Sequence, residues 1–148
     1  MPQRCSDRSS ERIVAIFGVI NHRDRSTHLC ALEIAGSGPD LDHLLPSDGW
    51  RPLQGPPGVQ QGTHPSPVAG VTVMLGGRMI ISVAGGTIPE ADLRAGDMLI
   101  LLDSRAPGHA TDVVGPDWLR AIGIKLPAEE WPRLRDAFEG WPEGMEAP

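Results

Sequence analysis

Short stretches in which apolar and polar residues alternate recur along this chain, and turns rich in glycine or polar residues separate them. The run Arg12–Ile20 is rich in β-branched residues, and the polar segment 21–26 ends it with Asn, Asp and Ser. The apolar run His28–Ala35 follows at once. Such runs, joined by a short polar turn, predict two antiparallel strands.

A second group of strands is predicted between Gly70 and Leu126. Alternation over Val71–Leu75, the pair Gly76-Gly77 and a second run Met79–Ala84 together indicate a hairpin. The further predicted strands lie near Ile88–Leu93, at Met98–Leu102, and within segments 108–115 and 118–126. Strands at short, regular spacing with glycine turns are typical of an all-β sandwich or barrel.

Two segments depart from the strand pattern. Residues 36–67 are rich in Gly, Pro, Ser and Asp, which predicts a long irregular loop, and loops of this length are often functional. Near the C-terminus, Trp131, Leu134 and Phe138 recur at helical spacing and predict one short amphipathic helix on the outside of the barrel. We therefore expect a flexible N-terminus at 1–11, a barrel at 12–127, and a C-terminal helix and tail at 128–148.

Composition narrows the classes of function. The 148 residues carry a formal net charge of −6 without a basic stripe, so we expect no nucleic-acid partner. No apolar run is long enough to cross a bilayer, and the first residues contain no apolar secretory segment, so we expect no membrane partner and a cytoplasmic location. The two cysteines, Cys5 and Cys30, are too few for a disulfide framework, and Cys30 reads as a small buried hydrophobe.

Two motifs resemble those of the cupin superfamily, and small single-domain bacterial cupins in particular. The cupin motif G-x5-H-x-H-x3,4-E-x6-G can be laid on the chain from Gly58 to Gly77, which puts His64 at the first ligand position. The second histidine of the motif falls on Ser66, and its glutamate falls on Gly70. The resemblance implies a double-stranded β-helix, or jelly-roll, barrel whose metal-ligand motif is incomplete.

The second cupin motif, G-x5-P-x-G-x2-H-x3-N, begins at Gly96 and reaches its histidine at His109. The loop before His109 is two residues longer than in the motif, and the asparagine has no match. Only two of the four metal ligands that the family uses therefore remain, so we favour no metal. A bound metal would be held by His64 and His109, with Zn, Ni or Fe as candidates and His28, Asp103 or Asp112 as replacement ligands.

Without a metal, His64 and His109 are predicted to face one cavity as a catalytic pair. An imidazole accepts or donates a proton near neutral pH, so one ring can act as base while the other acts as acid. Asp103 is the third predicted catalytic residue because it could orient an imidazole through its ring N–H, although an Asp here could also cap a turn.

The ligand-binding residues are predicted from their positions beside these histidines. Ser66 and Thr111 lie two residues from a histidine and offer hydroxyl groups on the same face of their strands. The alternation beginning at Gly70 predicts that Thr72 and Met74 line the cavity, and the missing glutamate side chain would leave room for a ligand. Trp50 could cover the mouth of the barrel or anchor its loop to the core.

These residues predict a protein that binds a small, mostly apolar organic molecule in the barrel. The leading hypothesis is a non-redox isomerase, cyclase or lyase that uses histidine acid–base chemistry, in specialised metabolism. One alternative is a metal-dependent cupin oxygenase or hydrolase with substituted ligands, and another is a binding protein without chemistry. The resemblance also implies a homodimer, since unpaired sheet edges favour pairing.

Overall fold

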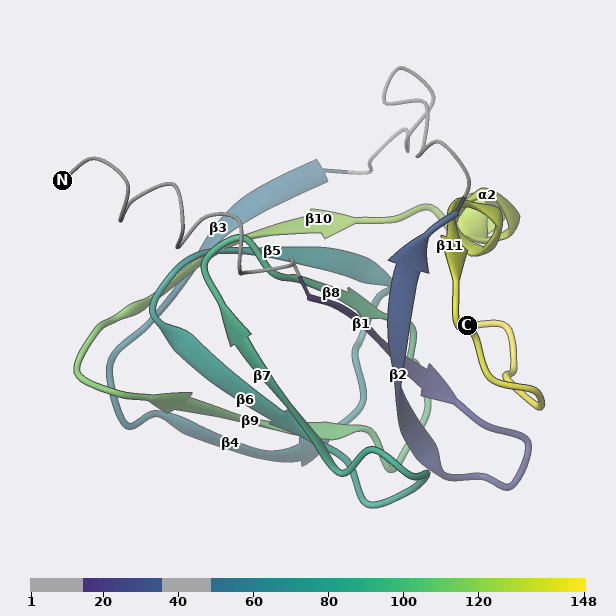
Figure 1. Cartoon of the computed structure of the whole chain (residues 1–148), viewed down its shortest axis with the longest axis horizontal. Helices are drawn as coiled ribbons and strands as arrows, with labels where there is room; N and C mark the ends of the chain where they lie inside the picture. The colour runs from purple at the N-terminus through teal and green to yellow at the C-terminus, as the bar shows by residue number, and fades with distance from the viewer. Residues whose placement is uncertain (1–14, 36–48) are drawn as a thin grey trace, which may run out of the picture.

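The computed structural model describes residues 15–35 and 49–148, and these form two β-sheets that face each other (Figure 1). The predicted flexible residues 1–11, and with them Cys5, lie outside the described part. The strands, in chain order, are β1 Ile16–Asn21, β2 Thr27–Ile34, β3 Gly49–Gly55, β4 Gln60–His64, β5 Gly70–Gly76, β6 Arg78–Ser82, β7 Glu90–Arg94, β8 Met98–Leu101, β9 His109–Val114, β10 Leu119–Lys125 and β11 Phe138–Glu139.

The order of strands within each sheet defines the fold. One sheet has the order β11-β2-β1-β8-β5-β10-β3, and the other has the order β4-β9-β6-β7. From β3 to β10, strands that are distant in sequence alternate within each sheet, as in an eight-stranded double-sheet jelly roll. β1 and β2 extend the larger sheet, where β1 pairs in parallel with β8 and antiparallel with β2. The predicted all-β jelly roll and its first antiparallel pair are therefore confirmed.

The prediction of a hairpin across Gly76-Gly77 is wrong. β5 pairs with β8 and β10 in the larger sheet, whereas β6 pairs with β7 and β9 in the smaller one. The turn carries the chain from one sheet to the other, and Gly77 has a φ of 77°. A Cβ on Gly77 would lie 2.5 Å from the Trp118 carbonyl oxygen. Alternation shows which residues face inward, but it does not identify the strand that pairs with them.

The prediction of an irregular loop over residues 36–67 is also wrong in its second half, which contains β3 and β4. Both are edge strands, and most of their residues are exposed, so neither shows the apolar alternation of a covered strand. β3 tolerates Pro52 because a strand at the edge of a sheet has one unpaired side. Residues 36–48, which include His43, lie outside the described part of the chain.

The predicted C-terminal helix is present. A 3₁₀ turn at Ala128–Glu130 leads into α2, Trp131–Ala137, and Leu134 of α2 is buried. The helix is shorter than the apolar spacing indicates, because Phe138 begins β11 and pairs with Ile34 of β2. None of the helices in the described residues is long and apolar enough to span a membrane.

The buried apolar side chains form two clusters on opposite faces of the larger sheet. The outer cluster joins β1, β2, β5 and β8 to the C-terminal segment through residues such as Ile20, Leu134 and Phe138. The inner cluster includes Leu99 of the larger sheet and Ile81 of the smaller one, so it fills space between the sheets. Cys30 belongs to the outer cluster, as its apolar surroundings predict, and burial raises the pKa of its thiol to about 12.

A stability prediction follows from Asp97, whose side chain is fully buried in the turn between β7 and β8. Its Oδ1 accepts a hydrogen bond from the Ala15 N–H at 3.0 Å, and its Oδ2 accepts one from the Arg94 N–H at 2.7 Å. Asp97→Ala leaves two backbone donors without these acceptors, which costs about 1–3 kcal/mol for each donor that stays buried. We expect the free energy of unfolding in urea to fall by at least about 2 kcal/mol.

The matched control is Asp92→Ala, which removes an exposed carboxylate paired with Arg78 at 2.8 Å. An exposed ion pair contributes about 0–1 kcal/mol, so this variant should remain close to the unchanged protein. Equal losses in the two variants would contradict the structural role assigned to Asp97.

Candidate functional site

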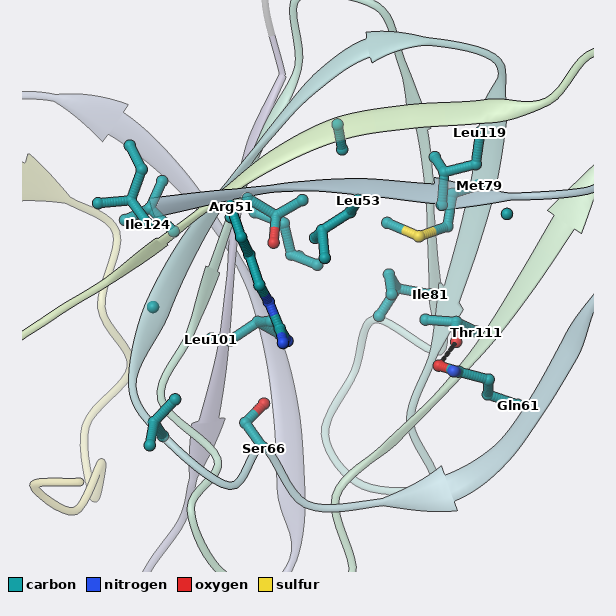
Figure 2. A pocket seen from close by; sticks show the side chains of 18 of the residues that line it. Arg51, Leu53, Gln61, Ser66, Met79, Ile81, Leu101, Thr111, Leu119 and Ile124 are labelled. Atoms are coloured by element: carbon teal, nitrogen blue, oxygen red, sulfur yellow. Dashed lines mark hydrogen bonds between the residues drawn. The ribbon is translucent and has the colours of Figure 1, made fainter. Parts of the chain in front are cut away.

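A cavity of about 820 Å³ opens between the two sheets. This volume is in the range of sites that bind small organic molecules. Its lining comes from the strands of the jelly roll other than β7. Figure 2 shows apolar side chains from both sheets around the cavity. Those that it labels include Leu53, Leu101 and Leu119 of the larger sheet, and Met79 and Ile81 of the smaller one.

His64 and His109 lie together on another part of the lining. They are cross-strand partners in β4 and β9, and their ring centroids are 4.8 Å apart with the ring planes tilted by 52°. The His64 Nδ1 lies 2.7 Å from the Gly62 carbonyl oxygen. A carbonyl only accepts hydrogen bonds, so Nδ1 carries the proton in the neutral ring, and Nε2 is left with the lone pair.

A buried chain of hydrogen bonds holds His109. Its Nδ1 lies 2.6 Å from Asp103 Oδ2, and Ser66 Oγ donates to Asp103 Oδ1 at 2.8 Å. Asp103 is fully buried, and Ser66 and His109 are each 4% exposed. A carboxylate that accepts from Nδ1 fixes the orientation and tautomer of an imidazole.

His109 lines the cavity, and its Nε2 keeps some solvent-accessible surface. Within the described residues, no buried side-chain nitrogen or oxygen lacks a hydrogen-bond partner. The hydrogen bond given for the His109 ring among these residues is the one through Nδ1, so Nε2 is not fully buried. The two histidines thus offer two Nε2 atoms to a ligand, and their catalytic role stays a prediction.

Two buried residues of the β1–β2 pair position the loop that carries Asp103. Asn21 donates to the Arg105 carbonyl oxygen and accepts from the Arg105 N–H, both at 2.9 Å. Thr27 Oγ1 accepts from the Gly108 N–H at 2.8 Å, inside the protein. The loop between β8 and β9 is therefore fixed at its middle and at its end by side chains that do not line the cavity.

Gly108 permits the close approach of the strands that carry the histidine pair. Its φ is 85°, which L side chains rarely adopt. A Cβ at this position would lie 2.1 Å from the His64 carbonyl oxygen. No other residue could therefore replace this glycine without moving His64 away from His109.

The remaining predicted ligand-binding residues occupy different positions. Thr72 and Thr111 line the cavity, and Thr111 Oγ1 donates to Gln61 Oε1 at 3.0 Å (Figure 2). Gly70 also lines it, yet a Cβ there would lie 2.9 Å from the Ile124 carbonyl oxygen. The absence of a glutamate side chain at Gly70 therefore does not add free volume for a ligand. The carbonyl oxygen of Ile124 in β10 lies too close to the point where a side chain would begin.

The prediction that Met74 lines the cavity is wrong. Its side chain is 1% exposed and belongs to the inner apolar cluster, and it is not among the lining residues. Met74 lies beside an irregularity in the β5–β10 register, where the inner cluster fills the barrel. Trp50 borders the cavity but is 69% exposed, and its role as a lid stays a prediction.

The proposed replacement metal ligands do not complete a metal site in the cavity. Neither His28 nor Asp112 lines it, and both oxygens of Asp103 bond to His109 and Ser66. No carboxylate of the part of the chain that the structure describes is among the lining residues. Two imidazoles alone fall short of the three protein ligands of a catalytic zinc site, so this donor set does not fit one.

A candidate metal-binding group does exist outside the cavity, at the turn between β1 and β2. The ligand atoms of His22, Asp24 and His28 all lie within 4.8 Å of one another. The two imidazole rings stack at 4.2 Å with an interplanar angle of 8°, so their lone pairs lie in separate, nearly parallel planes. One ring would have to rotate before both could bind the same ion.

Four polar residues of the lining were not predicted from the sequence, namely Arg51, Gln54, Gln61 and Lys125. Arg51 enters the cavity from β3, and Gln61 from β4 (Figure 2). Both lie in the stretch that was predicted to be a loop. The spacing of Arg51, Leu53 and Gly55 was the available signal, because alternate residues of a strand share one face.

The anchoring of the loop generates a second testable prediction. Thr27→Val keeps the shape of the side chain but removes the acceptor of the Gly108 N–H, and an unsatisfied buried donor costs about 1–3 kcal/mol. We expect lower stability together with faster hydrogen exchange at the Gly108 amide, measured by NMR.

Thr27→Ser is the control for this prediction, because it removes a methyl group and keeps the hydroxyl. It should lose about 1 kcal/mol of packing energy while the Gly108 amide stays protected. Equal protection of Gly108 in the Val and Ser variants would show that Thr27 does not anchor the loop.

No family model matches the chain, and no curated protein matches it. Among solved structures, the chain is similar to the cupin domain of Cnp3 from Schizosaccharomyces pombe, with a TM-score of 0.43 and 13% identity over 83% of this chain and 95% of that one. It is also similar to a predicted oxalate decarboxylase from Thermotoga maritima, with a TM-score of 0.40 and 19% identity over 80% and 96% of the two chains. Neither similarity indicates the ligand or the activity of this chain. The strand order of its two sheets makes the chain an all-β protein with a double-sheet jelly-roll fold.

Proposed function

We propose that this protein binds a small organic molecule between its sheets and moves a proton on that molecule without a redox step. One observation supports the proposal above all others. His64 and His109 meet on the wall of a cavity of ligand size, and the buried carboxylate of Asp103 holds His109. This arrangement suits an isomerase, cyclase or lyase that works by general acid–base catalysis.

The hydrogen bonds assign different parts to the two imidazoles. His109 is the better base, because Asp103 orients its ring and stabilises the imidazolium that forms when Nε2 takes a proton. His64 is the acid, and its Nε2 in the protonated ring gives a proton to another atom of the ligand. One proton leaves the ligand and one is returned to it, so the step is balanced. Exchange with water then restores the two rings.

The remainder of the lining suits an amphipathic ligand. The apolar side chains around the cavity, which include Met79 and Ile81, give the hydrophobic part of a ligand a surface away from water. Gln61 and Thr111 lie next to the histidine strands and bond to each other, which fixes the direction of the Gln61 amide. The ligand we propose is therefore mostly apolar, with a polar group near the imidazoles.

The alternative of a metal-dependent oxygenase or hydrolase has weaker support from the donor set. Within residues 15–35 and 49–148, the lining of the cavity supplies two imidazoles and no carboxylate. Residues that match the family's second histidine and its glutamate are Ser66 and Gly70, and a side chain at Gly70 would meet the backbone of Ile124. Acid–base catalysis needs only the imidazoles of His64 and His109, which the lining does supply.

Solvent exchange tests proton transfer before the natural substrate is known. The protein is incubated in D₂O with a panel of small aliphatic and aromatic ketones and the matching 2-oxo acids. Loss of the C–H signals beside the carbonyl is followed by proton NMR. We expect exchange with at least one compound, and we expect it to fall about 100-fold or more in His109→Gln, because a positioned general base contributes about that factor.

His64→Gln is the second variant, since His64 is only half-buried and its loss should leave the fold intact. His22→Gln is the matched control, because His22 belongs to a second pair of neighbouring histidines, which does not line the cavity. Exchange that survives both cavity variants, or no exchange with any compound, would contradict the proposal. Binding of a panel compound without exchange would favour the non-catalytic alternative.

A further inference from the structure

Among the described residues, the charged side chains that line the cavity are all basic. Arg51 and Lys125 line it together with the two histidines, whereas none of the aspartates and glutamates in residues 15–35 and 49–148 does. The chain as a whole carries a formal net charge of −6, so the positive charge of these lining side chains is opposite in sign to the net charge of the chain. A cleft lined by one sign of charge, with apolar walls, attracts ligands of the opposite sign.

The strand geometry directs Arg51 across the cavity. Arg51 and Leu53 are two residues apart in β3, so their side chains share its inner face. In Figure 2 the guanidinium of Arg51 points toward Ser66 and Leu101. The cross-strand partner of Arg51 in β10 is Gly123. A Cβ on Gly123 would lie 3.2 Å from Leu53 Cδ1 and 3.9 Å from Arg51 Cγ. The glycine therefore gives both side chains the space to lie across β10.

Arg51 has no acidic partner in the described part of the chain. Several other arginines do pair with a carboxylate, among them Arg78 with Asp92 at 2.8 Å and Arg135 with Asp136 at 3.3 Å. The guanidinium of Arg51 therefore keeps its donors free for a ligand. A guanidinium presents two parallel N–H groups that match the two oxygens of a carboxylate.

We infer that the ligand of this cavity is a carboxylate, held by Arg51 through its two oxygens with its apolar body against Leu53 and Met79. This inference rests on the proposed function and names its substrate class. A carboxylate fits better than a phosphate ester, because a single guanidinium matches one flat anionic group. Phosphate sites in proteins add several backbone N–H donors or a helix N-terminus, and none of the described helices contributes to this lining.

Binding measurements with matched ligand pairs test the inference. The probes are hexanoate, cyclohexanecarboxylate and 3-phenylpropionate, each compared with its primary amide, which has a similar shape without the charge. Phenyl phosphate is the additional anionic probe. Dissociation constants come from ligand-observed NMR at low salt, where interactions between exposed charges are least screened.

We expect at least one acid to bind about tenfold or more tightly than its amide, and we expect Arg51→Gln to abolish that preference. Arg51→Lys keeps the charge without the planar fork, so it should keep only part of the preference. Arg120→Gln is the matched control, since Arg120 is an exposed arginine of the adjacent strand β10 and does not line the cavity. This control should bind like the unchanged protein.

Several results would overturn the inference. They are equal binding of acids and amides, a preference for acids that survives in Arg51→Gln, tighter binding of phenyl phosphate than of every acid, and no binding of any acid at about 10 mM. The outcome is separable from that of the exchange experiment. Loss of carboxylate binding in Arg51→Gln concerns recognition, whereas loss of exchange with retained binding in His109→Gln concerns chemistry.

Discussion

The buried carboxylate of Asp103 is the group on which the candidate site depends. Burial of a charge is costly unless hydrogen bonds replace the water that it loses. Here His109 and Ser66 supply these bonds, one to each oxygen. The Ser66 N–H also donates to the Asp103 carbonyl oxygen at 2.9 Å, so backbone and side chain join the same two segments. The need to satisfy one carboxylate therefore fixes the segment after β4 against the loop before β9.

This link gives the fold and the site a common framework. The jelly roll brings β4 and β9 together as neighbours although β4 ends at His64 and β9 begins only at His109. The hairpin of β1 and β2 lies outside the eight-stranded core, yet Asn21 and Thr27 hold the loop that ends at Gly108. Strands that do not line the cavity thereby help to position the loop that leads to His109.

The sequence was sufficient to predict those parts of the fold in which burial leaves a periodic pattern. The two N-terminal strands, the strands after Gly70 and the C-terminal helix all bury one apolar face. The strands β3 and β4 escaped prediction because they are exposed edge strands, in which Pro52 and a run of polar residues resemble a loop. The partner sheet of β6 was also not predictable, since alternation carries no information about pairing.

The candidate site was predictable only to the extent that motif spacing pointed to it. The cupin resemblance singled out His64 and His109, and the structure places their rings side by side. The bonds of Asp103 depend on a contact between residues 37 positions apart, Ser66 and Asp103, which no local pattern encodes. Arg51 was not predicted as a site residue, because its strand β3 was predicted to be a loop. Met74 was predicted to line the cavity, but its side chain packs in the inner apolar cluster instead.

Several polar residues of the lining lie on edge strands, so side chains that could contact a ligand are separate from those that stabilise the fold. Arg51 and Gln61 each extend from a strand that is hydrogen-bonded to one neighbour only, and neither side chain belongs to an apolar cluster. Replacement of such residues leaves the inner and outer clusters untouched. Evolution can therefore change what this barrel accepts at its open flank without rebuilding the packing that keeps the two sheets together.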